Sequence, residues 1–333
     1  MRPSDPPPFA VRRHTLAEPA ARAAYEALAR DSPLASAYAG LGLAERCAAA
    51  YGLEAALLSV QPAGAAPNAP WEAGMVAFER RRGPFRVLAL PPLVPTTGPL
   101  VRTLPAEAAV HARHTPLDAL AAHLCTAYDQ ATLAPAPALT DGRAFAWAGF
   151  ALGVRYTYLL TVQPGESATA WSESARRLLA RHAAAYTVRE APEAAAVLWA
   201  LAERSYARQG ARLGLDPART QALVAALAAA GDARLFVAER DGTPEAAALV
   251  PVCGRHASYG LSGSTPGPAM TVLFAGVLPH LAARGIEVFD LNGANVPGIA
   301  EFKRRLGAQL VPVLRMRYVR SPVLRIAQAL RMP

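Results

Sequence analysis

One short stretch of the sequence, residues 289–303, gathers the side chains that are best suited to chemistry. It holds Asp290, Asn292, Asn295 and Lys303 among glycines, in an order that predicts the end of a strand, a polar loop and the start of a helix. Such a loop directs backbone N–H groups and amide side chains at whatever lies beyond the carboxyl end of the strand. This window is therefore the first candidate for a functional site.

The composition of the chain points to the same window. Of the 34 basic residues, 33 are Arg and Lys303 is the single Lys, and only three Asn and three Ile occur beside 77 Ala. Five of these seven Lys, Asn and Ile residues fall between residues 286 and 303. Ammonium and guanidinium groups differ in shape, hydration and pKa behaviour, so a lone Lys among many Arg indicates a site that requires lysine. The other interpretation is that one Lys must fall somewhere and that the Asn residues only cap turns.

Length and composition set the class of protein. A chain of 333 residues suits two domains of about 100–200 residues each, and 53% hydrophobic with 18% charged residues is typical of a globular protein. The longest apolar stretch, residues 144–162, is interrupted by Arg155, so we expect no membrane span, and the proline-rich start lacks the apolar segment of a secretory signal. Three cysteines without a paired spacing indicate reduced thiols and a cytoplasmic location.

The net charge of +9 is concentrated near the C-terminal end. Glu301 is the last acidic residue, and eight basic residues follow it. A basic end favours an anionic partner such as nucleotide phosphates, tRNA or a membrane surface. The plainer interpretation is a solvated strand and helix.

Hydrophobic periodicity and turn residues predict an α/β (α+β) chain with the same order of elements in each half. In the first half, strands are expected at 9–14, 53–60, 74–79, 85–90 and 155–162, and helices at 19–30, 34–51 with Ser32 as its cap, and 117–128. In the second half, helices are expected at 169–185, 192–209, 217–230, 269–284 and 297–306, and strands at 234–240, 246–252, 255–261, 286–291 and 309–318. The repeated order predicts two domains, 1–165 and 166–320, followed by a basic tail, 321–333.

A second loop, residues 262–268, carries glycines and hydroxyl groups between a predicted strand and a predicted helix. Backbone N–H groups at such a helix start could bind the phosphates of a substrate, although an ordinary turn explains the pattern equally well. His111 and His114 could share one helical face, but no cysteine or paired carboxylates accompany them. We therefore expect no metal site.

The C-terminal half resembles the FemAB-like branch of the GNAT N-acyltransferases. The resemblance rests on Phe-Asp-Leu-Asn-Gly at residues 289–293, followed by Pro-Gly-Ile-Ala-Glu-Phe-Lys at residues 297–303, and on the segments 234–239 and 258–264. It implies two tandem GNAT-like domains, each a mixed, mostly antiparallel sheet flanked by helices. It also implies transfer of an acyl group from a thioester donor, acyl-CoA or an acyl carrier, to an amine acceptor, with no bound cofactor.

The resemblance and the residue chemistry together suggest roles for individual side chains. The amine must lose a proton before it attacks, and Asp290 is the first candidate base, ahead of Glu239 and His256. Lys303 would meet the phosphate of the donor or the carbonyl oxyanion, and Tyr259 would protonate the leaving group. The residues expected to bind the substrate are Asn292, Gly293, Asn295, Pro297, Gly298 and Phe302. Those expected to bind the phosphate of the donor are Ser262, Gly263, Ser264 and Gly267.

Two other functions fit the same sequence. The first is an aminoacyl-tRNA-dependent transferase that acts on a cell-wall precursor, with the basic tail on the RNA backbone. The second is a non-catalytic module that binds an anionic glycan or a membrane surface, through arginines of the basic end: Arg315, Arg317, Arg320, Arg325 and Arg331. The acceptor would be a small molecule, a glycan or a peptide, and a role in the cell envelope is the expected context.

Overall fold

The computed structural model describes residues 8–66, 68–163, 165, 168–321 and 324. The chain forms two compact units, each built from separate segments. Unit 1 contains Met1–Ala35, Cys47–Arg155 and Pro312–Pro333, and unit 2 contains Ser36–Arg46 and Tyr156–Val311. The chain thus passes between the units after Ala35 and again within α2 (Leu41–Tyr51), β7 (Ala151–Thr161) and β14 (Gln309–Val319). The division predicted from sequence crosses only once, near residue 165.

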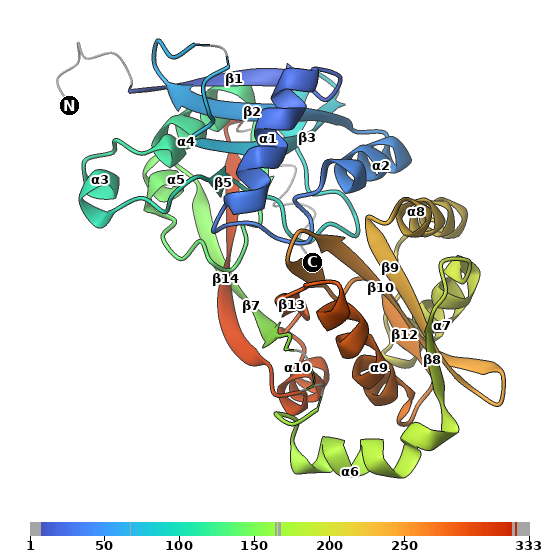
Figure 1. The fold of residues 1–333 in the computed structure, drawn as a ribbon. Coiled ribbons are helices and arrows are strands. Elements are labelled where there is room, and N and C mark those ends of the chain that lie inside the picture. Colours follow the sequence, from blue (N-terminus) through green and yellow to red (C-terminus); the bar gives the residue numbers. More distant parts are fainter. Residues whose placement is uncertain (1–7, 67, 164, 166–167, 322–323, 325–333) are drawn as a thin grey trace. The chain divides into compact units, whose positions relative to one another are not determined.

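Unit 1 is a mixed, mostly antiparallel sheet with helices packed on it (Figure 1). Its strands run in the order β1–β2–β3–β4–β6–β14, with β5 beside β3, and only β4 and β6 pair in parallel. Besides α2, β7 and β14, its elements are β1 (Phe9–Thr15), α1 (Pro19–Asp31), β2 (Glu54–Pro62), β3 (Ala73–Arg82), β4 (Phe85–Leu88), β5 (Leu100–Val101), α3 (Glu107–His111), α4 (Pro116–Ala127), β6 (Gln130–Leu133) and α5 (Arg143–Trp147).

The core of unit 1 lies between one face of this sheet and the helices α4 and α5. Helix α4 begins where the sequence supplies a capping box, since Thr115 accepts the N–H of Asp118 and the Asp118 carboxylate accepts the N–H of Thr115. Its apolar side meets alternate residues of the strands, because successive side chains of a strand point to opposite faces of the sheet. The shared core includes Leu58, Met75, Leu120, Leu124, Leu133, Phe145 and Met316.

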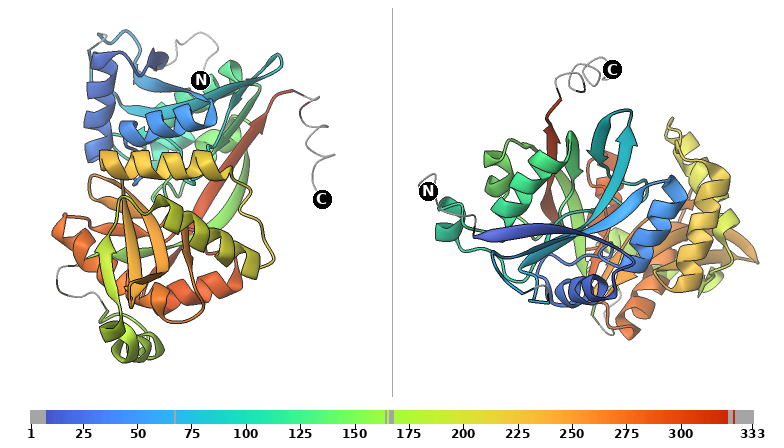
Figure 2. Two further views of the ribbon diagram at one scale, coloured as in Figure 1. Left: turned by 90° about the vertical axis from the view of Figure 1, so that its right-hand side faces the viewer. Right: turned by 90° about the horizontal axis from the view of Figure 1, so that it is seen from above.

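Unit 2 repeats this architecture (Figure 2). Its strands run in the order β7–β13–β11–β10–β9–β8, with β12 also paired to β10, and only β11 and β13 are parallel. Besides the shared α2, β7 and β14, its elements are α6 (Glu173–His182), the 3-10 turn η1 (Ala183–Ala185), β8 (Thr187–Glu190), α7 (Ala195–Arg208), α8 (Pro217–Ala230), β9 (Ala233–Arg240), β10 (Thr243–Cys253), β11 (His256–Ser258), β12 (Ser262–Ser264), α9 (Ala269–Ala283), β13 (Val288–Asp290) and α10 (Pro297–Arg305).

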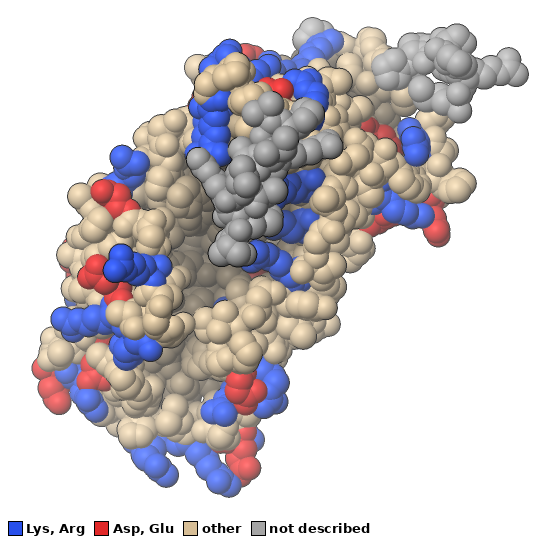
Figure 3. All heavy atoms as spheres, turned by 180° about the vertical axis from the view of Figure 1, so that it is seen from behind, with Lys and Arg blue, Asp and Glu red and all other residues tan. Residues whose placement is uncertain are grey.

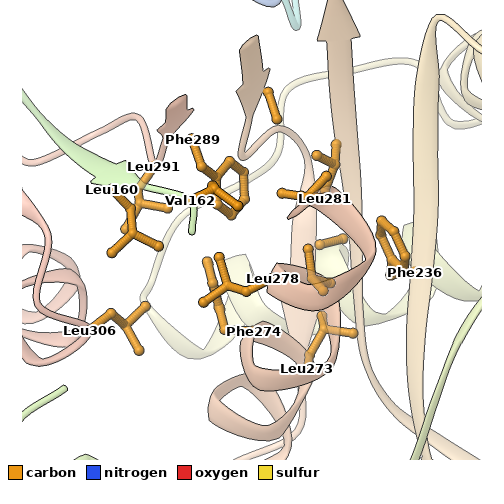
Figure 4. Close-up of a cluster of buried hydrophobic side chains, with 14 of the residues drawn as sticks. Leu160, Val162, Phe236, Leu273, Phe274, Leu278, Leu281, Phe289, Leu291 and Leu306 are labelled. Atoms are coloured by element: carbon orange, nitrogen blue, oxygen red, sulfur yellow. The ribbon is translucent and has the colours of Figure 1, made fainter. Parts of the chain in front are cut away.

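Helix α9 forms the centre of the unit 2 core. Phe274, Leu278 and Leu281 on this helix pack against Phe236 of β9 and Phe289 of β13 (Figure 4). Helix α9 is apolar on most of its circumference, which suits a helix buried in the middle of a unit. Because Phe289 is fully buried, its neighbour Asp290 is held at a fixed position at the end of β13.

Most of the predicted helices and strands are confirmed. In places a loop or a short strand stands where a longer element was predicted. The helix expected at 34–51 begins only at Leu41, because Ser32 is the C-cap of α1 and its hydroxyl accepts the N–H groups of Leu34 and Val101. The strand expected at 255–261 is shortened to β11, and β12 lies in the segment that was expected to be the loop 262–268. Strands β6 and β8 were not expected. The predicted basic tail, 321–333, lies outside the described residues apart from Ser321 and Leu324.

Candidate active site

Strands β11 and β13 part at the carboxyl end of β13. They pair in parallel over three residues, from His256 with Val288 to Ser258 with Asp290, and the N–H of Tyr259 then donates to the carbonyl of Asp290 at 2.7 Å. The next residue, Gly260, turns away and donates its N–H to the carbonyl of Leu249 on β10 at 2.9 Å. A Cβ on Gly260 would stand 2.9 Å from that oxygen, so this turn requires glycine. The parting leaves the end of β13 without a strand partner on its β11 side.

The carboxyl group of Asp290 lies where these strands part, and its two hydrogen-bond donors among the described residues are uncharged. Its Oδ1 accepts the hydroxyl of Thr157 from β7 and, at 2.8 Å, the backbone N–H of Asn292. Burial raises its pKa above the ordinary aspartate value, and these two hydrogen bonds and the charge of Lys303 oppose the shift. A carboxylate with a raised pKa is a stronger base than an exposed one, which suits proton abstraction.

Asn292 ties the loop after β13 to the end of the neighbouring strand, β11. Its backbone is left-handed, with φ of 54°, a conformation that asparagine tolerates better than most residues. Its Nδ2 donates to Ser258 Oγ at 2.7 Å and to the carbonyl of Tyr259 at 2.8 Å. It also lies 3.3 Å from the hydroxyl of Tyr38, which belongs to the Ser36–Arg46 segment of unit 2. The amide thus bridges β11, the loop and a segment from the first half of the chain.

Lys303 points inward, under the same loop. It is 3% exposed, and its Nζ donates to the backbone carbonyl of Asn292 and, at 2.9 Å, to that of Gly293. The ammonium also lies 5.6 Å from the centre of the Tyr259 ring. Burial lowers the pKa of Lys303 to about 8, and the negative charge of Asp290 opposes this shift. The lone lysine therefore holds the loop in place from below, with its donors directed at the protein backbone.

Tyr259 brings a protonated hydroxyl to the site. Its Oη lies 3.4 Å from Met270 Sδ, a weak acceptor, and burial raises the pKa of Tyr259 to about 12, against a hydrogen bond to Ser262. The hydroxyl therefore stays protonated near neutral pH and can donate. Ser262, which was predicted to bind the phosphate of the donor, forms a hydrogen bond with Tyr259.

Four of the predicted substrate-binding residues are exposed around the loop: Gly293, Asn295, Pro297 and Gly298. The amide of Asn295 brackets the backbone of Tyr156, accepting its N–H at 3.1 Å and donating to its carbonyl at 3.3 Å. Pro297 occupies the first turn of α10, where its missing N–H costs nothing. Phe302 is half-buried and packs edge-on against Phe274, with ring centres 5.7 Å apart. Its contacts are with the core of unit 2.

Other predicted residues lie away from Asp290. Glu239 pairs with Pro244 beside the β9–β10 turn and forms an ion pair with Arg189 at 2.9 Å. Asp290, by contrast, is level with the far end of β10. Gly263 is in strand β12, where a Cβ would meet the backbone of Leu201 in α7 at 2.2 Å, so this glycine serves close packing.

The other residues of loop 262–268 that were predicted to bind phosphate also lie away from Asp290. Ser264 donates its backbone N–H to Ser205 of α7 at 2.9 Å. Gly267 is exposed, just before Pro268 and the start of α9. His256 lies two residues before Ser258 on β11, and burial lowers its pKa. The structure thus brings Asp290, Asn292, Gly293, Lys303, Tyr259 and Ser262 together and spreads the others out.

Three side chains of the site were missed from the sequence. Thr157 is in a predicted strand, but nothing in its own position indicates a contact with a residue 133 positions away. Tyr38 is 254 positions from Asn292. Ser258 had a signal, because it stands directly before Tyr259 at a predicted strand end. In the part of the chain that the structure describes, no group of three or more His, Cys, Asp or Glu side chains could hold a metal ion. Searched over the same residues, no helix is long and apolar enough to cross a membrane.

Comparisons with known proteins agree on the fold of the chain. Residues 170–304 match the family described as acetyltransferase (GNAT) domain. No curated protein matches the sequence. Among solved structures, FemX has a TM-score of 0.70 at 13% identity, covering 95% of this chain and 99% of its own.

Two other solved structures have the same fold. A tandem GNAT protein from the clavulanic acid biosynthesis pathway has a TM-score of 0.56 at 13% identity, covering 94% and 99% of the two chains. The C-terminal domain of a putative lysylphosphatidylglycerol synthetase from Agrobacterium fabrum has a TM-score of 0.54 at 15% identity, covering 93% and 96%. At these identities the likeness establishes the fold.

Proposed function

We propose that the protein transfers an acyl group from a thioester donor to an amine, because residues 170–304 match the acetyltransferase (GNAT) domain and the chain has the fold of FemX and of a tandem GNAT protein. The donor would be an acyl-CoA or an acyl carrier, and the acceptor a small molecule, a glycan or a peptide. The observation that carries the proposal is the position of Asp290 at the parting of β11 and β13. A carboxyl with a raised pKa stands there at the start of a polar loop, and the carbonyl of the same residue accepts the backbone N–H of Tyr259.

The proposed reaction is direct. The neutral amine attacks the thioester carbonyl, the new N–C bond forms as the C–S bond breaks, and the leaving thiolate takes a proton. Asp290 accepts the proton that the amine gives up, directly or through a water, and Tyr259 donates to the thiolate. Thr157 and the N–H of Asn292 hold the carboxylate in place, while Lys303 and the Asn292 amide fix the loop around it.

The first experiment identifies the reaction. The purified protein is incubated with acyl-CoA, acyl-carrier and aminoacyl-tRNA pools plus amine acceptors, and mass spectrometry shows which donor is consumed and where the acyl group goes. We expect a thioester to be consumed and an amide to appear. Consumption of aminoacyl-tRNA alone would establish an aminoacyl-tRNA-dependent transferase instead. Consumption of no donor would support the non-catalytic module that binds a glycan or a membrane surface.

The second experiment tests the base. Asp290→Asn should lower turnover by about 10²-fold or more, the usual contribution of a general base. Because the base acts when ionised and burial raises the pKa of Asp290, wild-type turnover should fall on acidification at a higher pH than an exposed aspartate would give. The matched control is Glu239→Gln, which removes a carboxylate of the same unit beside the β9–β10 turn, at the opposite end of β10 from Asp290. If Glu239→Gln abolishes the acid limb and Asp290→Asn does not, the base is Glu239.

A further inference from the structure

A cavity of about 710 Å³ lies in unit 1 among α3, α4 and α5 (Figure 1). Its volume falls in the range of about 300–1,000 Å³ that is usual for small-molecule sites. The residues that line it come from these three helices, from positions next to their ends and from Pro8, and all of them belong to unit 1. The residues of the candidate active site around Asp290 belong to unit 2.

Small side chains leave this space open. On α4 the wall contains Asp118, Ala119 and Ala122, which are spaced by one, three and four residues and therefore lie near one another on one side of the helix. The leucines of α4 pack into the core of unit 1 instead. Helix α5 contributes Ala144 and, at its end, Ala148. Because alanine fills little volume, the cavity between these helices has largely apolar walls.

Trp147 of α5 gives the cavity an aromatic wall. Its side chain is 39% exposed, whereas the other three tryptophans of the chain are buried. Two guanidinium groups lie over its ring, that of Arg113 at 5.1 Å and that of Arg143 at 5.7 Å from the ring centre. An exposed indole beside alanine methyl groups offers contact area to an apolar body of the size of a ring system.

The two arginines at this ring differ in their charge partners. Arg143 forms an ion pair with Asp141 at 2.7 Å. Arg113 lines the cavity, and no ion pair joins it to a carboxylate of the described residues. Paired charges are common elsewhere on the surface, where Figure 3 shows acidic residues beside basic ones at several places. The guanidinium of Arg113 can therefore bind an anionic group that comes from outside the protein.

The backbone of Arg113 gives a second, independent indication. It is left-handed, with φ of 57°, and it ends α3, where the N–H of Arg113 donates to the carbonyl of Val110 at 3.0 Å. Glycine is the usual residue at such a helix end, because it adopts this conformation without steric cost. Residues in unfavourable backbone conformations are common at binding sites. An arginine where glycine would fit better thus indicates a use for its side chain.

The acidic residue of the wall restricts the kind of anion. Asp118 Oδ2 accepts the N–H of Thr115 at 2.9 Å and the hydroxyl of the same residue, so its carboxylate stays in the capping box. A phosphate monoester, with about 1.5–2 negative charges, would share the cavity with this carboxylate and meet one guanidinium. A carboxylate carries a single charge, which matches Arg113, and His111 on the same wall can add an N–H donor.

We propose that this cavity binds a small aromatic carboxylate, with the carboxylate group at Arg113 and the ring system against Trp147 and the alanines. The cavity and the loop around Asp290 belong to different units, so ligand binding here and acyl transfer can be measured separately.

The first test compares four probes by titration calorimetry on the full-length protein, near neutral pH and at fixed ionic strength. They are naphthylacetate, its uncharged analogue naphthylacetamide, naphthyl phosphate and acetate. Naphthylacetate should bind more tightly than the other three, and about 10-fold or more above the amide, as expected for a charge-assisted hydrogen bond. The proposal is wrong if naphthylacetate does not bind at millimolar concentration, or if the amide, acetate or the phosphate ester binds as tightly.

The second test removes the charge. Arg113→Gly should weaken naphthylacetate binding by about 10-fold or more and abolish its advantage over the amide. Because glycine suits the left-handed backbone, this variant should melt close to the wild-type temperature, so lost binding would not reflect lost folding. The matched control is Arg143→Gln, which removes the other charge over Trp147 and should leave the affinity within about twofold. Equal losses in both variants would show a general charge effect and overturn the proposal.

The third test fills the cavity without changing its charge. Ala122→Leu enlarges a side chain of the wall and should weaken naphthylacetate binding by about fivefold or more. Thr126→Leu is the control, because it places the same side chain one turn later on α4, at an exposed position that does not line the cavity. Melting temperatures check that both variants fold. Unchanged binding in Ala122→Leu, or equal loss in both variants, would place the ligand elsewhere on the protein.

Discussion

Glu79 of unit 1 and Asp290 of unit 2 are both sheltered carboxylates on strands, but their partners differ. Glu79 on β3 is 8% exposed and meets two guanidinium groups, with Arg13 Nη2 at 2.9 Å and Arg86 Nη2 at 4.0 Å, and it also accepts the hydroxyl of Tyr128. Asp290 accepts hydrogen bonds from a threonine hydroxyl and a backbone N–H. The ammonium nearest to it, on Lys303, donates to backbone carbonyls.

The difference separates a structural carboxylate from a reactive one. Two guanidinium groups and the hydroxyl of Tyr128 bind Glu79 into the fold, so a change there disturbs packing. Neutral donors around Asp290 fix its position but leave its charge largely uncompensated, and its pKa rises. Two units of the same architecture can thus differ in chemistry through the partners of a single carboxylate.

The largest effect should come from Glu79→Ala, which tests the structural half of this comparison. Removing the carboxylate leaves the hydroxyl of Tyr128 without its acceptor and takes from the guanidinium of Arg13 its more buried partner, and unfolding should become easier by about 3 kcal/mol. Urea unfolding measures this loss, and turnover per folded molecule should not change. Glu54→Ala is the control, because Glu54 also pairs with Arg13 but is 66% exposed, so its loss should cost less than about 1 kcal/mol. Equal losses of unfolding free energy in the two variants would show that the burial of Glu79 does not increase its contribution to stability.

A smaller effect is expected from Lys303→Met, which tests the reactive half. The variant leaves the carbonyls of Asn292 and Gly293 without their donor, at a cost of about 2 kcal/mol, and loosens the loop around Asp290, so turnover should fall. The pH dependence of the unfolding free energy tests whether the buried ammonium of Lys303 is responsible for the loss of stability. Because the pKa of Lys303 is about 8 when folded and 10.5 in the reference state, the unfolded chain binds more protons between these values.

The unfolding free energy of the wild type should therefore rise with pH in this window, relative to that of Lys303→Met. Chemical unfolding at several pH values from about 7 to 10 measures the difference between the two proteins, so that other titrating groups cancel. A flat difference would mean that Lys303 is not buried as a charge, and an unchanged turnover would remove it from the site.

The smallest effect is expected from Tyr38→Phe, which tests how far the site extends into the first half of the chain. The hydroxyl lies 3.3 Å from Asn292 Nδ2, and its loss should lower turnover about threefold with KM little changed, as expected for one modest neutral hydrogen bond. Arg46→Ala is the control, because Arg46 anchors the same segment to Asp232 at 2.6 Å. It should lower the melting temperature and leave turnover unchanged. A larger loss of turnover in Arg46→Ala would assign the effect to the segment as a whole.

The sequence predicted the fold class and the family well, for identifiable reasons. The α8 helix was placed correctly because Asp216 caps it, Pro217 starts it and Gly231 ends it in a left-handed conformation. Lys and Asn are scarce in the chain, and their occurrence together pointed to the loop after β13. The structure explains why these residue types stand there. Asn292 occupies a left-handed position and uses its amide as a bridge, Asn295 brackets a backbone, and Lys303 fills a buried position with two carbonyls to satisfy.

The roles of these residues could not be obtained in the same way. Composition shows that a position resists substitution but not whether the side chain faces substrate or backbone, so the contact predicted between Lys303 and the donor stays a prediction. Glu239 and Asp290 look alike in sequence, and only the register of β9, β10 and β11 separates them. The contributions of Thr157 and Tyr38 depend on pairings across 133 and 254 residues, which no local pattern encodes.

The discontinuous make-up of the units has a consequence for the order in which the chain can fold. Strand β14, at residues 309–319, supplies the partner of β6 in unit 1, so that sheet is incomplete until residue 319 has been synthesised. Unit 2 in turn needs residues 36–46, which are made early. Neither half can finish folding as an independent domain emerging from the ribosome, and the early sheet edge at β6 stays open for that time, as a strand edge prone to pairing with other chains.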